Sequence, residues 1–520
     1  MVDVLVVGAG PAGLTTALLL AQRGVRVRCV DKHREISPLP RARGVHARAV
    51  EILRSCGVEP AMRAAELHIV PRLEVRTNLA EPPLNTMIAG GPELAEISPC
   101  EGIAIAQDVF ESVLRDALLR TPGAELYRGT ELLGCATRDE GVTAELLDHS
   151  TGRATRLDVQ FVVAADGWAS PVRTGLGIAV DGPADLGVNR AVTFRADLGK
   201  WLSDPPPSLV SLATVRGVLL RTHADHRWAV NVPDQAHLPN DAVELVRYAL
   251  GLPTLGLEVM TSSCWSASAQ VARRFGVGRV FLVGDAAHRV PPTGGTGISS
   301  AMADAHNLAW KLAAVIKGWA GPHLLDSYAE ERRPVAVATT AACLGLWQAW
   351  SRGEQPSGVD LRMLDMGYAY GEPAAGLADL EGPCAPEARV GSRAPHIRLR
   401  RASHESILDL FGDTFALLAG PAGGIWRTAA MTLGTAGLLM TGRCGPRGDP
   451  RSARVPLAAH LIDEPAFATA YGLDARGAVL VRPDGHVAWR YDEPARPLDL
   501  GGATALLAEA LLTAAGWDRK

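Results

Sequence analysis

The stretch VDVLVVGAGPAG, residues 2–13, decides the fold of this chain. Its first half is apolar nearly throughout and rich in valine, which is typical of a strand buried on both faces of a parallel sheet. Each glycine then has a distinct physical role, since Gly8 makes a tight turn, Gly10 lets a pyrophosphate approach the backbone, and Gly13 allows close packing of helix on strand. Residues 14–22 have a helical pattern, so the amide groups at the helix start would face the phosphates.

A second strand is expected at residues 26–30, and an acidic residue, Asp31, stands at its end. Asp31 lies at about the 20-residue distance at which an acid accepts hydrogen bonds from ribose hydroxyls. We therefore expect an ADP-containing dinucleotide to bind here. A purely structural glycine loop is the alternative, and the motif alone does not distinguish FAD from NAD.

Two further motifs follow predicted strands. Residues 157–165 form an apolar strand that ends in Asp166-Gly167, for which a simple β-turn is the alternative. Residues 279–283 form another strand, which ends in Gly284-Asp285 and precedes the glycine-rich run PPTGGTG at 291–297. A long helix is expected next, because apolar residues recur there at helical spacing: Ile298, Ala301, Met302, Ala305, Leu308, Ala309, Leu312 and Ile316.

The start of that helix is a favourable place for negative charge. A helix that begins in a glycine-rich loop directs free amide groups and a partial positive charge at whatever lies before it. Reduced flavin carries negative charge around N1 and the C2 carbonyl, so such a helix suits a flavin. Asp285, at a strand end, is placed to bind ribityl hydroxyls.

The three motifs, in this order and separation, resemble those of the class A flavoprotein aromatic hydroxylases, whose prototype is p-hydroxybenzoate hydroxylase. The resemblance implies that all three line FAD and that the Asp-Gly segment also takes part in NAD(P)H binding. It implies that Gln107 contacts the flavin, and that Arg41 or Arg43 meets FAD and helps the flavin ring move. Alternatives are a helix-capping role for Gln107 and a solvated helix face for the arginines, Arg48 included.

The residues predicted to bind FAD lie in these motifs and beside them. The backbone carbonyl of Pro292 is in addition the one catalytic contact that the resemblance implies, because it would face the substrate ring. The predicted FAD-binding residues are Gly8, Gly10, Pro11, Ala12, Gly13, Asp31, Lys32, Arg41, Arg43, Gln107, Asp166, Gly167, Gly284, Asp285, Pro292, Gly295, Thr296, Gly297 and Ile298.

One departure from the family pattern concerns the flavin ring. The family commonly has Gly-Gly-Gln-Gly with an asparagine two residues on, whereas this chain has Thr296 for the glutamine and Ser299 for the asparagine. Backbone amide groups would then replace side-chain contacts to the ring. His288 is a candidate catalytic base, and a purely structural role is the alternative.

At 520 residues the chain is too long for one hydrophobic core, so two or three domains are expected. The resemblance implies an α/β fold: a Rossmann-like FAD-binding domain of the glutathione-reductase type, an inserted antiparallel-sheet substrate domain and a thioredoxin-like C-terminal domain. The FAD-binding domain is expected at residues 1–75, 100–178 and 270–350, and the substrate domain at 76–99 and 179–269. Residues 351–389, rich in Gly, Pro and Ala, are interpreted as a linker, and 390–520 as the C-terminal domain.

The two smaller domains carry weaker signals. The C-terminal domain has no CxxC, so disulfide exchange is not expected, and packing or a homodimer contact is the predicted role. The substrate domain contains polar and aromatic residues that the sequence does not rank as substrate ligands: Trp201, Arg221, His223, His226, Trp228 and Asn231.

Composition excludes several classes of function. Lys and Arg number 52 against 56 Asp and Glu, without a long run of either sign, so nucleic acid is not an expected partner. The eight cysteines are scattered, which argues against a disulfide framework or a metal site. No apolar stretch reaches the roughly 20 residues of a membrane span, and the first residues do not form a signal peptide, so a cytoplasmic protein is expected.

The resemblance also implies a reaction. NAD(P)H, either NADPH or NADH, would reduce the flavin, O2 would form a C4a-hydroperoxide, and its distal oxygen would pass to an electron-rich ring carbon. The C-terminal domain points to the branch that acts on polycyclic polyketide-type phenols or quinones in antibiotic biosynthesis. Three alternatives stay open: Baeyer–Villiger oxygenation of a polyketide ketone, an FAD oxidase or dehydrogenase without an oxygenated product, and a docking subunit with a vestigial flavin site.

Overall fold

The computed structural model describes residues 2–39, 41–88, 94–352, 354, 362–371, 387–401, 404–436, 454–492 and 498–517. A six-stranded sheet forms the centre of the N-terminal part, in the order β17-β18-β9-β1-β2-β5. Its strands run parallel except β17. Their bounds are β1 Val4–Val7, β2 Val27–Asp31, β5 Ala124–Arg128, β9 Phe161–Ala164, β17 Gly276–Val277 and β18 Val280–Leu282.

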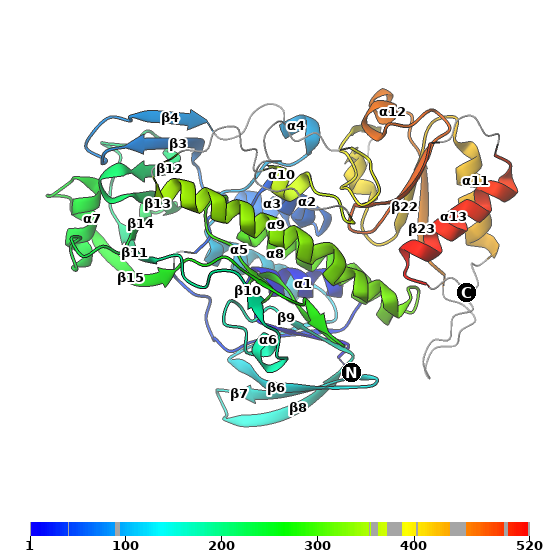
Figure 1. Cartoon of the computed structure of the whole chain (residues 1–520), viewed down its shortest axis with the longest axis horizontal. Coiled ribbons are helices and arrows are strands. Elements are labelled where there is room, and N and C mark those ends of the chain that lie inside the picture. Colours follow the sequence, from blue (N-terminus) through cyan, green and yellow to red (C-terminus); the bar gives the residue numbers. More distant parts are fainter. Residues whose placement is uncertain are drawn as a thin grey trace.

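Helices bury the faces of this sheet. α1 (Pro11–Gln22) packs against both α5 (Gln107–Arg120) and α8 (Gly297–Ile316). α1 is apolar on nearly every side because helices and sheet surround it, and its residues from Gly13 to Ala21 are buried. α2 (Ala47–Ser55) and α3 (Glu59–Ala64) lie beyond, in the blue part of Figure 1.

The apolar segment expected as one strand at residues 157–165 is two strands. β8 (Arg153–Val159) pairs with β7 (Gly141–Asp148), which pairs with β6 (Thr130–Arg138), in a separate three-stranded sheet. β9 begins only at Phe161. Gln160 causes the break, because its backbone N–H donates to the carbonyl of Asp3 at 2.9 Å and its side chain donates to the Asp3 carboxylate at 3.1 Å.

A seven-stranded sheet forms the second layer, in the order β15-β11-β14-β13-β12-β3-β4, at the upper left of Figure 1. All its neighbours are antiparallel except β3 and β12, so the expected antiparallel sheet has one parallel pair. α7 (Ala242–Leu250) covers a core that includes Phe194 and Trp228. The strands are β3 Val70–Arg76, β4 Asn85–Ile88, β11 Val188–Arg195, β12 Pro207–Leu212, β13 Gly217–His223, β14 Arg227–Pro233 and β15 Glu258–Ser266.

Two of the expected domain boundaries do not coincide with the limits of the sheets, as the strand pairing shows. The boundary between residues 75 and 76 falls inside β3, so the chain enters the seven-stranded sheet at Val70. The boundary between 178 and 179 comes before β10 (Val180–Asp181), which pairs with β16 (Gln270–Ala272) next to β19 (His288–Arg289). The reason is the same in both places: strand partners lie far away in the chain, so local patterns do not mark where a strand belongs.

The long helix α9 (Asp326–Ser351) follows α8. Within the predicted linker, α10 (Arg362–Met366) packs on α9, where Leu364 joins Ala342 and Cys343 in a small apolar cluster. Residues 353, 355–361 and 372–386 of that linker lie outside the described residues. α10 is therefore packed on the FAD-binding domain, whereas Tyr370 stacks on His486 of the C-terminal domain.

The C-terminal domain has a four-stranded sheet in the order β23-β22-β24-β25, shown in orange and red in Figure 1. β22 is parallel to β23 and antiparallel to β24, which forms a hairpin with β25. This βαβ unit followed by a hairpin and a helix is the expected thioredoxin-like arrangement. The elements are β22 Phe415–Ala419, α11 Gly424–Ala436, β23 Leu457–Leu461, α12 Pro465–Tyr471, β24 Ala478–Val481, β25 Val487–Tyr491 and α13 Leu500–Ala514.

Ionic contacts join this domain to α2. Arg48, for which a solvated helix face was one alternative, is buried and donates to Glu51 and to the backbone carbonyl of Asp484, both at 2.9 Å. Arg393 also donates to Glu51, at 2.9 Å through its Nε. Glu51 thus lies between two guanidinium groups from different domains, which fixes the C-terminal domain against α2.

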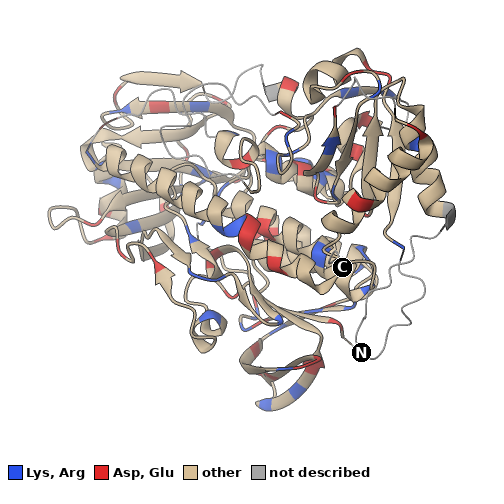
Figure 2. Cartoon of the chain, turned by 45° about the vertical axis from the view of Figure 1, so that its right-hand side comes forward, with Lys and Arg blue, Asp and Glu red and all other residues tan. Residues whose placement is uncertain are grey.

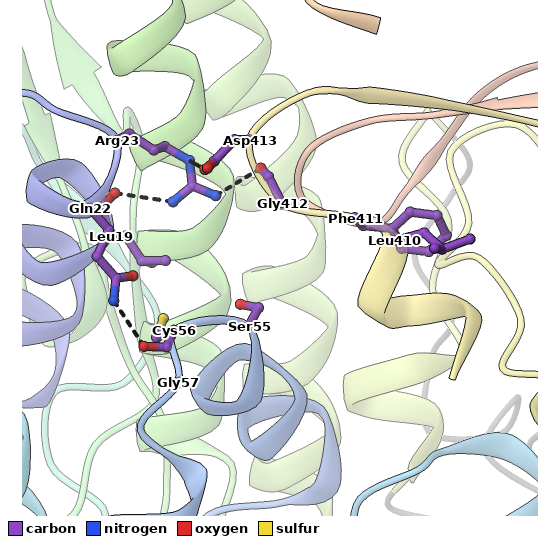
Figure 3. A pocket seen from close by; sticks show the side chains of 10 residues that line it. All are labelled: Leu19, Gln22, Arg23, Ser55, Cys56, Gly57, Leu410, Phe411, Gly412 and Asp413. Atoms are coloured by element: carbon purple, nitrogen blue, oxygen red, sulfur yellow. Dashed lines mark hydrogen bonds and ion pairs between the residues drawn. The ribbon is translucent and has the colours of Figure 1, made fainter. Parts of the chain in front are cut away.

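A cavity of about 450 Å³ lies in the seam between the two domains. Figure 3 shows Arg23, near the end of α1, reaching across it: one terminal nitrogen donates to the carbonyl of Leu19 and the other to that of Gly412, both at 3.0 Å. α1 spans about 17 Å, so the cavity lies a helix length from the glycine loop. It belongs to the domain seam.

Among the helices of the described residues, none combines the length and the apolar character needed to cross a membrane. Figure 2 shows Lys and Arg interspersed with Asp and Glu over the molecule. Neither sign of charge gathers on one side in this view.

Candidate flavin site

The three motif loops converge at the carboxyl ends of neighbouring strands. Gly8 follows β1, Asp166 follows β9 and Gly284 follows β18, and these strands are adjacent in the central sheet. A Cβ placed on Gly8 would lie 2.2 Å from the carbonyl oxygen of Ala165, and one on Gly284 would lie 2.9 Å from the Cβ of Ala12. The crevice outside the carboxyl ends of parallel strands is where α/β folds bind ligands.

The glycine fingerprint has two closed positions and one open one. Gly8 has φ +101°, and a Cβ on Gly13 would lie 1.8 Å from the Gly8 carbonyl oxygen, so only glycine fits at both. A Cβ on Gly10 would meet nothing within 4 Å. α1 begins at Pro11 without a side-chain cap among the described residues. The loop therefore presents free amides beside open space, which is what a pyrophosphate requires.

Asp31 lies beside this loop, as its position in the sequence predicts. One carboxylate oxygen accepts the N–H of Ala9 at 2.7 Å, and the other accepts the N–H of His33 at 2.8 Å. Each oxygen retains capacity for a further hydrogen bond. Lys32, the next residue, is exposed.

Asp166 organises its own turn. It accepts the Ser170 hydroxyl at 2.6 Å and the N–H of Val172 at 3.0 Å, so both carboxylate oxygens are engaged at the start of α6 (Pro171–Gly175). Burial raises the pKa of the Asp166 carboxyl above its ordinary value. Gly167, at φ +80°, has open space around it. The structure thus gives Asp166 a capping role.

Arg173 ties the Asp-Gly turn to the Gly-Asp turn. Its Nη1 donates to the carbonyl of Ala286 at 3.0 Å, and both terminal nitrogens contact the carbonyl of Trp168, at 3.4 and 3.3 Å. Because one guanidinium serves both turns, the two motifs form one unit.

Asp304 of α8 contacts the Gly-Asp turn from the protein interior. This fully buried carboxylate accepts the N–H of Gly284 at 3.1 Å, contacts His288 Nε2 at 2.6 Å and accepts Arg332 Nε at 2.8 Å. Burial opposes its ionisation, but His288 and Arg332 outweigh that effect and lower the pKa of Asp304. His288 is itself buried and stacks on Phe275, which fits the structural alternative.

Asp285 occupies the open side of the same turn. Its side chain is exposed, yet the protein packed around it raises the pKa of the carboxyl above its ordinary value, and Arg41 acts in the opposite direction. A carboxylate that is reachable and close to the fingerprint loop suits hydrogen bonding to ligand hydroxyls. The contact of Asp285 with a ribityl chain stays a prediction.

The run before α8, residues 291–297, is here called the flavin loop. The carbonyl of Pro292 accepts the N–H of Gly295 at 3.2 Å, so one of its two lone pairs already closes a turn. The side chain of Thr296 is buried, and its hydroxyl lies 3.6 Å from Cys343 Sγ of α9. α8 starts at Gly297 without a side-chain cap in the part of the chain that the structure describes, so its first amides, including that of Ile298, are available to a ligand.

Arg43 has unmet hydrogen-bonding capacity at this site. Its Nε and Nη1 atoms are buried and find no hydrogen-bond partner within the described ranges. Burial lowers the pKa of Arg43 to about 10. A buried guanidinium without a counter-charge is costly, so these two donors suit an anionic group of a ligand.

Gln107 positions the arginine segment. Its Oε1 accepts the N–H of Ala42 at 3.3 Å, its backbone N–H donates to the Ala42 carbonyl at 3.1 Å, and its Nε2 donates to Glu111 at 2.8 Å. Ala42 separates Arg41 from Arg43, so Gln107 holds both from the first residue of α5. Arg41 is exposed.

FAD fits the residues that are present. The open position at Gly10, the uncapped starts of α1 and α8 and the unpaired Arg43 offer donors to phosphates and to a flavin ring. Asp31 and Asp285 offer acceptors to sugar hydroxyls.

Several residues of this site escaped the sequence reasoning. Asp304 lies between Ala301 and Ala305 on the buried face of α8, and an acid within an apolar face is the signal that could have found it. Arg128 pairs across from Asp31, and its Nε and Nη2 are buried without a partner among the residues described. Local patterns gave no signal for Arg128 or for Arg332.

Three of the substrate-sheet residues, His223, Trp228 and Arg221, each contact a group within the protein. His223 Nε2 lies 3.1 Å from Asp108 Oδ2 and joins this sheet to the start of α5. The indole of Trp228 is buried and donates to the carbonyl of Ala196 at 3.0 Å. Arg221 lies over the Trp228 ring at 5.9 Å.

Two family descriptions match consecutive parts of this chain. "FAD binding domain" matches residues 1–342, and "Aromatic-ring hydroxylase, C-terminal" matches residues 387–516. The chain belongs to the FAD-dependent aromatic-ring hydroxylases. The hydroxylase is thus an enzyme that uses FAD, of the monooxygenase type, and the family expected from the three motifs is confirmed.

Relatives of the hydroxylase match over nearly its whole length. It is 36% identical over 539 residues to tetracenomycin A2 monooxygenase-dioxygenase of Streptomyces glaucescens, across 94% of this chain and 93% of that protein. It is 34% identical over 546 residues to 4-methyl-5-nitrocatechol 5-monooxygenase of Burkholderia sp, across 94% of each chain. The crystal structure of a ternary complex of aklavinone-11 hydroxylase with FAD and aklavinone is similar with a TM-score of 0.85, 32% identity and 98% coverage of both chains.

Proposed function

We propose that this hydroxylase consumes NAD(P)H and O2 to hydroxylate a ring of a polycyclic, polyketide-type phenol or quinone in antibiotic biosynthesis. The observation that carries the proposal is likeness over nearly the whole length, C-terminal domain included, to proteins named for tetracenomycin A2 and aklavinone. The relative named for a nitrocatechol makes a single-ring phenol the competing substrate class.

The protein's own part in this reaction is binding, orientation and exclusion of water. When bound, FAD supplies the redox and oxygen-transfer chemistry. Arg43 and the first amides of α1 would hold the pyrophosphate, while Asp31 and Asp285 would accept hydrogen bonds from the sugar and ribityl hydroxyls. The amides that open α8 would face the negative charge of the reduced ring.

Pro292 is the proposed contact to the substrate. Its carbonyl oxygen has one lone pair engaged by Gly295 and a second that no other described residue engages, so it can accept a hydrogen bond from a phenolic hydroxyl. That hydrogen bond would orient the ring and increase electron density at the carbon that receives oxygen. The substrate-sheet domain and the FAD-binding domain would together exclude water while the oxygen atom is transferred.

An anaerobic NADPH titration of the full-length holoenzyme tests the proposal. Flavin bleaching is followed alone, with a hydroxylated anthraquinone and with 4-methyl-5-nitrocatechol as the single-ring control. We expect the anthraquinone to accelerate bleaching, and O2 readmission to give a product heavier by one oxygen atom. NMR separates a new phenol from a lactone, which would instead indicate Baeyer–Villiger insertion. Acceleration by the nitrocatechol alone would overturn the polycyclic assignment, and a flavin that stays oxidised throughout would overturn the monooxygenase role.

Two further expectations belong to this proposal. A cytoplasmic location is tested by fractionation of the source cells, and a homodimer through the C-terminal domain by light scattering. Lys and Arg lie interspersed with Asp and Glu along the ribbon in Figure 2, which does not favour nucleic acid as a partner.

A further inference from the structure

His46 links the flavin loop to α10. It directly precedes α2, and its ring Nδ1 contacts the carboxylate of Asp365. Its backbone N–H donates to the hydroxyl of Ser299 at 3.1 Å, in the first turn of α8. The other ring nitrogen, Nε2, lies 3.4 Å from the position of a Cβ on Gly295. The imidazole therefore lies between α10 and the centre of the flavin loop.

Both neighbours of the ring are hydrogen-bond acceptors. Asp365 offers a carboxylate at Nδ1, and the backbone of Gly294 is the second hydrogen-bonding group at the ring. A neutral imidazole has one N–H, whereas the protonated ring has two, so a carboxylate and a carbonyl are satisfied together only by the protonated form. Burial alone would lower the pKa of His46, but Asp365 and Gly294 outweigh burial and raise it.

We propose that His46, with a proton on each ring nitrogen, is a positioning residue that holds the Gly294 peptide and so directs the N–H groups of the flavin loop at the flavin. This goes beyond the proposed function and rests on its flavin site. His46 acts through the loop and is not itself assigned a contact with the reacting atoms.

The loop needs such an anchor because of its composition. Gly294 and Gly295 have φ +115° and +65°, a region that favours glycine, and glycine loses more conformational freedom on ordering than other residues. The two threonines of the loop flank the glycine pair and contact α9: the Thr293 hydroxyl donates to the Cys343 carbonyl at 2.7 Å, and Thr296 lies against the Cys343 thiol. His46 is the side chain that holds the glycine pair between them.

The charged surroundings of His46 are simple. Asp365, from α10, is the charged group in contact with the ring among the described residues. Ser299 of α8 does not titrate. Cys343 of α9 lies near Asp365, and burial raises the pKa of its thiol to about 11, so it is neutral when His46 titrates. Asp365 is therefore the charged group that controls the protonation of the His46 ring.

The test measures the dissociation constant of FAD between pH 5.5 and 9 with the full-length chain, by flavin fluorescence. Three variants are compared with the natural chain: His46→Gln, Asp365→Asn and His149→Gln. His149 is a matched control, because its Nε2 lies 2.9 Å from Glu131 on the separate sheet of β6 and β7. Thermal melting of the FAD-free proteins reports folding separately from affinity.

We expect the FAD affinity of the natural chain to fall about tenfold as pH rises through the raised pKa of His46, the equivalent of one charge-assisted hydrogen bond. His46→Gln should bind weakly and without this pH dependence. Asp365→Asn should keep the transition but move it to lower pH, because the carboxylate that raises the pKa is gone. His149→Gln should behave like the natural chain.

Natural affinity and an unchanged pH profile in His46→Gln would overturn the proposal. Should His46→Gln fail to fold, Asp365→Asn decides, since it leaves the ring in place: an unmoved transition would also overturn it. FAD binding without hydroxylation of any aromatic compound would refute the proposed function and leave this inference intact.

Discussion

Replacing Asp304 by asparagine tests whether a buried charge supports the flavin site. The Asp304 carboxylate accepts from the Gly284 N–H and from Arg332 Nε at 3.1 and 2.8 Å, and contacts His288 at 2.6 Å. An asparagine has one acceptor oxygen and no charge, so the Arg332 guanidinium, only 1% exposed, loses its counter-ion. Breaking a buried ion pair in this way costs about 3–5 kcal/mol.

The same change should alter the response to acid. The folded-state pKa of Asp304 is lowered, so its contribution is fully present above the unfolded-state value of about 3.9 and is lost as pH falls through the folded value. Below that window the natural chain and Asp304→Asn should converge in stability. Above it the natural chain should be the more stable of the two.

Urea unfolding of the FAD-free chain, followed by circular dichroism, measures the effect. Asp225→Asn is the matched control, because Asp225 also contacts two arginines but is 46% exposed, where ion pairs contribute about 0–1 kcal/mol. Adding Arg332→Met to Asp304→Asn should restore part of the loss, since the unpaired charge is removed. Equal unfolding midpoints for Asp304→Asn and Asp225→Asn would refute the reasoning.

Two further predictions concern the fingerprint and Arg43. Gly10→Ala should fold normally but bind FAD at least about tenfold more weakly, because its Cβ enters the open space assigned to the pyrophosphate. Gly13→Ala should in addition lower the melting temperature, because its Cβ would lie 1.8 Å from the Gly8 carbonyl oxygen. Calorimetric melting with FAD titration checks both, and equal melting temperatures would contradict the contrast. Arg43→Met should raise the melting temperature of the FAD-free chain, because the buried unpaired charge disappears, yet weaken FAD binding by about tenfold. A variant that retains natural FAD affinity would show that Arg43 meets no anion.

Much of the central domain followed from local sequence. The strand, glycine turn and helix at residues 2–22 and the acid at Asp31 have the predicted positions, because each depends on backbone geometry within a few residues. The helix at α8 followed from its apolar spacing. The thioredoxin-like sheet followed from family resemblance.

Other features had no local signal. The segment at 157–165 is divided because Gln160 bonds to Asp3, more than 150 residues away. β3 joins the second sheet because it pairs with β12, and no pattern within residues 70–76 specifies that partner.

The sequence by itself determined that this chain binds a dinucleotide through glycine turns on parallel strands, and its motif order determined the flavin family. These properties are local, because a left-handed backbone or a buried strand restricts the residues that can occupy it. Only the tertiary structure decided which charged groups are paired. The buried pair of Asp304 and Arg332 is 28 residues apart, and the half-buried His46 and its partner Asp365 are 319 apart. Such pairs form because a buried charge requires a partner in space, and distance along the chain does not enter that requirement.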